Sequence, residues 1–189
     1  RRSELRAGRL EATVTPVGAG GQNQSNRGWR SLPRAARLYV AGVIVTGAGA
    51  LAFFVPLTLP RPALFAVLLI AACLTSLWKV TLPVAGASHA TLSMSYAANL
   101  MALLLLGPRE AMIVGTAGVW AQCTFRTRGR YPAYRTAFSM GAEAITMAAT
   151  GFVYVSLGAA PRPFDLPLLA RPLIGAIATY FVVNTGLVA

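Results

Sequence analysis

Long apolar runs dominate this chain after residue 37. A helix that crosses the hydrocarbon core of a bilayer, about 30 Å thick, needs roughly 20 predominantly apolar residues. Three runs approach that length, and the other three are shorter, at about 15 or 16 residues each. The six runs cover residues 38–59, 63–78, 91–106, 111–125, 137–157 and 172–189. The sequence therefore predicts an all-α, polytopic membrane protein with six transmembrane helices.

A short polar break separates the two central runs. Gly107 and Pro108 are followed by Arg109 and Glu110. Helix breakers next to charges indicate a hairpin turn between two spans. A long helix of a soluble core is disfavoured, because such helices carry a polar face and these runs do not.

The positive residues fall mainly on alternate connections between the runs. Of the 17 Lys and Arg residues, 13 lie on one side of the predicted topology: Arg1, Arg2, Arg6, Arg9, Arg27, Arg30, Arg34, Arg37, Lys79, Arg126, Arg128, Arg130 and Arg135. The other side holds only Arg61, Arg109, Arg162 and Arg171. Because cytoplasmic connections carry the excess of Lys and Arg, both termini are predicted to be cytoplasmic.

The first 37 residues differ in composition from the rest. They are rich in Arg, Gly, Ser, Asn and Gln, with GAGGQNQSNRG at 18–28. Such a segment buries too little apolar area to offset its ordering entropy, so 1–37 is predicted to be a disordered basic cytoplasmic tail and 38–189 a six-helix membrane domain. The chain begins with Arg rather than Met and ends inside an apolar run. We therefore expect a fragment of a longer protein.

The net charge of +12 invites a nucleic-acid interpretation. The arginines lie beside the predicted spans, however, where attraction to anionic lipid of about 1 kcal/mol each explains them. The lipid bilayer, and not nucleic acid, is the expected partner.

No catalytic constellation is visible. The chain has one histidine, five acidic residues and two cysteines, Cys73 and Cys123, which lack metal-site spacing. The sequence thus predicts no catalytic residues, no metal site, no cofactor and no enzyme activity within this chain.

Polar residues at membrane depth are the candidate site, because each is costly enough there to need a reason. Glu143 lies about six residues into its run, roughly 9 Å below the membrane surface. Its burial costs on the order of 2 to 3 kcal/mol unless it faces the bundle interior or is protonated. In a structural interpretation, the Glu143 carboxylate reaches back to the membrane interface or bonds a hydroxyl on another helix. In a functional interpretation, it belongs to a ligand or proton site. Gln122, near the same leaflet, is a predicted neighbour.

The segment 79–96, KVTLPVAGASHATLSMSY, is too polar for an ordinary span. It predicts either a loop leading into a short helix or irregular backbone lining a cavity. His89 in this segment and Asn99 just after it complete the candidate ligand-binding set with Glu143 and Gln122. Asn99 is alternatively an interhelical hydrogen-bond partner.

Small residues recur at four-residue spacing in the fourth and fifth runs. The pairs are Ala111 with Gly115, Ala137 with Gly141, and Ala144 with Ala148. Small residues let helices approach closely, so these two runs are predicted to form the tightly packed centre.

The stretch SHATLSMSYAANLMALLLLGPREAMIVGTAGVWAQCTFR, followed by a basic loop and YPAYRTAFSMGAEAITMAATGFVYVSLG, resembles the N-terminal membrane sensor (MASE-like) regions of bacterial cyclic-di-GMP signalling proteins. Those regions precede a cytoplasmic HD-GYP phosphodiesterase or GGDEF cyclase domain, whose motifs do not occur in this chain. The resemblance, over about residues 80–189, implies a sensory or anchoring domain in the bacterial cytoplasmic membrane. It also implies an output domain in cis and an unidentified small ligand, and it leaves a homodimer open.

Two alternatives remain. The chain is also similar to the substrate-binding subunits of energy-coupling-factor vitamin importers, in which small residues such as Ala111 and Gly115 would contact a partner subunit. A purely structural membrane anchor would need only packing.

Overall fold

The computed structural model describes residues 29, 32–56, 60–77, 79–82, 90–93, 95–125, 132–158 and 166–188. The chain divides into two units, Arg1–Leu32 and Pro33–Ala189, and all the helices and strands named below belong to the second. Most of the predicted tail, and with it the prediction of disorder, lies outside the described residues.

Each apolar run contains one helix. The helices are α1 (Arg34–Phe54), α2 (Pro62–Leu77), α3 (Ser95–Leu105), α4 (Pro108–Phe125), α5 (Ala133–Ser156) and α6 (Leu166–Val188). The predicted helical architecture is confirmed to this extent.

Fewer of these helices are suited to crossing a membrane than the six predicted. Three are long and apolar enough: Arg34–Phe54, Ala133–Ser156 and Leu169–Val188. The 16-residue α2 and the 11-residue α3 are too short for that class, since they extend only about 24 Å and 16 Å at 1.5 Å per residue. The 18-residue α4 is less apolar because it includes Arg109 and Glu110.

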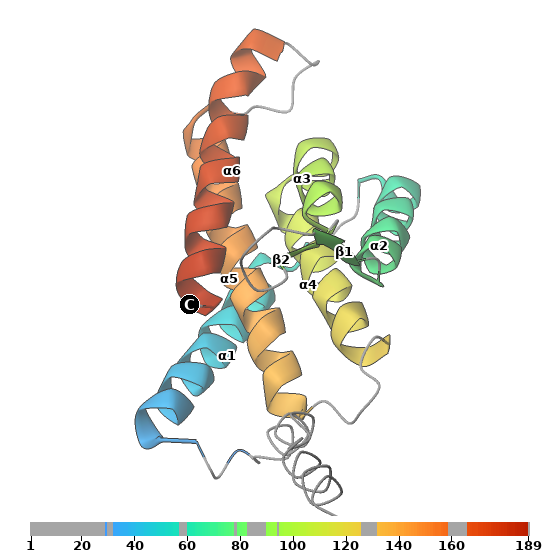
Figure 1. Cartoon of the computed structure of the whole chain (residues 1–189). Coiled ribbons are helices and arrows are strands. Elements are labelled where there is room, and N and C mark those ends of the chain that lie inside the picture. Colours follow the sequence, from blue (N-terminus) through green and yellow to red (C-terminus); the bar gives the residue numbers. More distant parts are fainter. Residues whose placement is uncertain are drawn as a thin grey trace, which may run out of the picture. The chain divides into compact units, whose positions relative to one another are not determined.

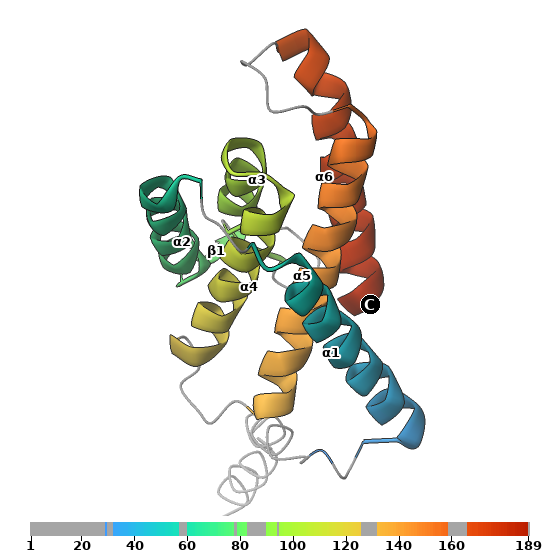
Figure 2. The same ribbon diagram turned by 180° about the vertical axis from the view of Figure 1, so that it is seen from behind.

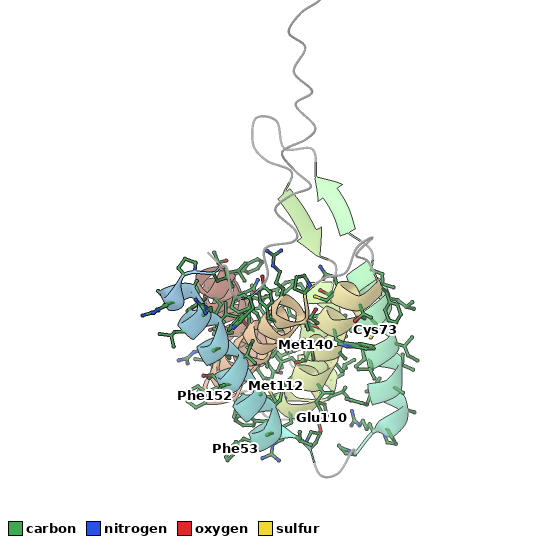
Figure 3. The ribbon with its side chains drawn as sticks, turned by 90° about the horizontal axis from the view of Figure 1, so that it is seen from below. Phe53, Cys73, Glu110, Met112, Met140 and Phe152 are labelled. Atoms are coloured by element: carbon green, nitrogen blue, oxygen red, sulfur yellow. The ribbon has the colours of Figure 1, made fainter. Side chains whose placement is uncertain are left out.

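Two short strands account for the shortness of α3. Strand β1 (Lys79–Leu82) pairs antiparallel with β2 (Ala90–Ser93), and Thr81 is opposite Thr91. Figure 3 shows the pair projecting away from the helices. We predicted a loop or irregular backbone here, and a helical run from residue 91. The β-branched residues Val80, Thr81 and Thr91 favour the extended conformation instead.

The antiparallel pair α4 and α5 forms the centre of the helical unit (Figures 1 and 2). Helices α1 and α6 pack against α5, whereas α2 and α3 pack against α4. Ala111 of α4 and Ala144 of α5 are completely buried. The central position that the small-residue spacing predicted for these two segments is therefore confirmed.

Glycines allow the closest helix contacts. A Cβ atom on Gly47 of α1 would overlap the backbone of Gly141 in α5. Similarly, a Cβ atom on Gly118 of α4 would lie 2.8 Å from Oγ of Ser76 in α2. Both sides of the central pair thus depend on the absence of a side chain.

The predicted hairpin between the central runs is present. Gly107 has φ of 107°, which favours glycine, and its N–H donates to the carbonyl of Ala102 over 3.3 Å. Helix α4 then starts at Pro108, so Arg109 and Glu110 belong to its first turn and not to the connection. Figure 3 shows Glu110 at this end of the helices.

The beginning of α1 and the end of α6 lie on the same side of the helical unit. The hydroxyl of Tyr39 donates a 2.8 Å hydrogen bond to the carbonyl oxygen of Leu187. The ring of Tyr39 also contacts that of Phe138 in α5, at 6.0 Å between centroids. These contacts tie the two outer helices to each other and to the centre.

Candidate functional site

Glu143 lies buried in the middle of α5, with 6% of its surface exposed. The helix begins at Ala133, after Pro132, and so starts before the predicted run at 137. Glu143 is consequently about 15 Å along the helix from its start, at 1.5 Å per residue. A carboxylate at this depth needs hydrogen-bond partners from neighbouring helices.

Two other helices supply those partners. The amide Nδ2 of Asn99 in α3 donates to Oε1 of Glu143 over 2.7 Å. The hydroxyl of Tyr180 in α6 lies 3.2 Å from Oε1 and 3.3 Å from Oε2. Both donors are neutral, so they stabilise the carboxylate without cancelling its charge.

Helix α4 contributes a glycine to the same place. A Cβ atom on Gly115 would lie 3.1 Å from Oε1 of Glu143, 3.3 Å from Nδ2 of Asn99 and 3.3 Å from Cγ of Met147. Four helices therefore meet around one carboxylate, which packs directly on the backbone of α4.

Tyr96 extends this group of polar side chains on α3. Its ring packs against that of Tyr180, with centroids 4.8 Å apart, and against that of Phe181 at 5.2 Å. The buried hydroxyl of Tyr96 and the buried Oδ1 of Asn99 have no hydrogen-bond partner. We call Glu143, Asn99, Tyr180, Tyr96 and Gly115 the Glu143 cluster.

The structure brings together two of the four predicted site residues. Glu143 and Asn99 share a hydrogen bond, which satisfies the interhelical role expected of Asn99. Gln122 is partly buried in α4, seven residues after Gly115 and hence about 10 Å further along the helix axis. His89 lies outside the described residues.

Tyr180 and Tyr96 were missed by sequence reasoning. Tyr180 stands alone as a hydroxyl-bearing aromatic inside an apolar run, and a buried tyrosine hydroxyl normally finds a partner. That isolation was the available signal, although nothing in the sequence pairs Tyr180 with Glu143.

The chemistry of the cluster is that of oxygen ligands around one negative charge. Carboxylate, amide and phenol oxygens accept hydrogen bonds and coordinate hard cations. Within the described part of the chain, no three His, Cys, Asp or Glu side chains are grouped as a site for a metal ion.

No protein-family model matches the chain, and neither a curated protein nor a solved structure shows significant similarity to it. The Glu143 cluster and the arrangement of the helices are therefore the features that bear on function.

Proposed function

We propose that this chain is the membrane-embedded sensory domain of a bacterial signalling protein, and that it passes a signal through α6 to a cytoplasmic output domain. The observation that carries the proposal is the hydrogen bond between Tyr180 of α6 and the buried Glu143 of α5. A change in the charge or the hydrogen bonding of Glu143 would alter this contact, which holds α6, the last helix, against α5. Small shifts of a packed helix are a common way to transmit such a change.

The proposed topology has six crossings of the bacterial cytoplasmic membrane and cytoplasmic termini. The segregation of positive residues supports it. So does the hydrogen bond from Tyr39 to Leu187, because it joins the start of the first helix to the end of the last. In this topology the short α2 and α3 require the bilayer to thin locally, at a cost of fractions of a kcal/mol per Å.

The output domain follows from the resemblance to cyclic-di-GMP signalling proteins and would be an HD-GYP phosphodiesterase or a GGDEF cyclase. A sensory function also explains why a carboxylate is buried at position 143 in spite of its cost, because packing alone would not require one. A purely structural anchor would tolerate an apolar residue at this position.

The transporter alternative has less support. It assigned Ala111 and Gly115 to a contact with a partner subunit. Ala111 is completely buried, and Gly115 packs against Glu143 inside the Glu143 cluster. Neither residue is therefore on a surface that a partner could reach.

The test uses the full gene product that contains these 189 residues, in native membranes. Cyclic-di-GMP turnover would be compared between wild type, Tyr180→Phe and the control Tyr134→Phe, at matched protein levels, since the Tyr134 hydroxyl accepts a hydrogen bond from Arg135 at the start of α5. We expect Tyr180→Phe to change turnover severalfold and the control to leave it close to wild type. Turnover unaffected by Tyr180→Phe, or no turnover in any membrane, would refute the proposal.

A further inference from the structure

We propose that the Glu143 cluster binds one small monovalent cation, H⁺ or Na⁺, which neutralises the carboxylate. This inference rests on the proposed sensory function, for which it names the class of ligand.

The carboxylate has no cationic partner among the residues that donate to it. Asn99 and Tyr180 are both neutral, and α4 contributes the uncharged backbone of Gly115. The titratable groups of the cluster besides Glu143 are the hydroxyls of Tyr180 and Tyr96. A buried charge without a counter-charge is costly, so a bound cation stabilises the site more than a third neutral donor would.

The neighbours can donate to the carboxylate or accept from it. An amide and a phenol hydroxyl each offer a donor and an acceptor. Asn99 turns Nδ2 toward Glu143, and its buried Oδ1 has no partner. Rotation of that amide would put Oδ1 where Nδ2 lies, beside Oε1 of Glu143. These oxygens suit a hard cation.

The packing limits the size of the ligand. A single methyl group on Gly115 would already lie 3.1 Å from Oε1 of Glu143 and 3.3 Å from Cγ of Met147. The ring of Tyr96 packs against that of Tyr180, which donates to Glu143. An organic ligand would have to separate these helices, whereas a proton adds almost no volume and a sodium ion is smaller than a methyl group.

The test is infrared difference spectroscopy of the chain reconstituted in lipid vesicles. In one arm the pH is varied without sodium, and in the other NaCl replaces choline chloride at constant pH. The other carboxyl groups titrate in both proteins, so the spectrum of Glu143→Gln is subtracted from that of the wild type. We expect one carboxyl signal that responds in the wild type to remain after this subtraction. A response to pH alone identifies H⁺, and a response to NaCl identifies Na⁺.

A matched control and a second variant keep the result interpretable. Glu110→Gln removes the other carboxyl group that is buried among the described residues and should keep the response. Tyr180→Phe keeps the ring packing but removes a donor to the anion, so it should move the midpoint of the titration. A response that is identical in wild type and Glu143→Gln, or absent in both, would overturn the cation site. Because the measurement needs no output domain, that outcome leaves the turnover test of the sensory function independent.

Discussion

Oε1 of Glu143 packs against the backbone of Gly115, so closely that a methyl group on Gly115 would lie 3.1 Å from this oxygen. The contact lets α3 and α5 share a hydrogen bond beside α4 without a side chain from α4 between them. The polar cluster and the close packing of the central helices are therefore one feature. Several of its consequences can be measured.

Gly115→Ala should destabilise the protein by about 1 to 3 kcal/mol, the usual cost of overpacking. Helix propensity alone would predict the opposite sign, because Ala is favoured over Gly in a helix by about 1 kcal/mol. The measurement is the midpoint of unfolding by sodium dodecyl sulfate, followed by circular dichroism. Gly49→Ala is the control, since its Cβ atom would meet nothing within 4 Å. Equal midpoints for the two variants would contradict the packing described here.

Gly47→Ala should cost more than Gly115→Ala. Its Cβ atom would lie 2.6 Å from the carbonyl oxygen of Gly141, and backbone cannot move aside as a side chain can. We expect α1 to separate from α5, with a loss of 3 kcal/mol or more, roughly the upper end for overpacking. The same unfolding assay applies, with Gly42→Ala as control because that position is open. A wild-type midpoint for Gly47→Ala would mean that α1 does not cross α5 at this glycine.

Asn99 and Glu143 should be energetically coupled. A double-mutant cycle with Asn99→Ala and Glu143→Ala should give a coupling of about 0.6 to 1.7 kcal/mol, the range for hydrogen bonds between membrane helices. The matched cycle uses Gln122→Ala with Glu143→Ala. Its coupling energy should be near zero, since Gln122 lies about 10 Å further along α4 than Gly115, which contacts Glu143. Coupling to Gln122 as large as that to Asn99 would restore the sequence-based pairing of Gln122 with Glu143.

The proposed topology puts residue 130 in the cytoplasm and residue 162 outside. Arg130→Cys and Arg162→Cys would be made in a background in which Cys73 and Cys123 are replaced by alanine. A membrane-impermeant thiol reagent applied to intact cells should label the 162 variant and spare the 130 variant until the cells are lysed. Labelling of the 130 variant alone in intact cells would reverse the orientation derived from the positive residues.

Sequence reasoning was strongest where a property depends on neighbouring residues. The helical runs, the hairpin at Gly107 and the central position of α4 and α5 follow from apolar length, helix breakers and small-residue spacing. It was weaker where two local tendencies compete. Around Thr91 the β-branched residues form β2, and α3 therefore begins only at Ser95.

The lengths of the apolar runs are enough to predict apolar helices, and the position of Glu143 is enough to identify it as a costly residue in one of them. How that cost is met depends on the packing of the helices. Asn99 is 44 residues from Glu143 and Tyr180 is 37 residues from it, on two other helices. Their meeting depends on which helices pack together and on the missing side chain of Gly115, and such long-range relationships leave no periodic signal in the sequence.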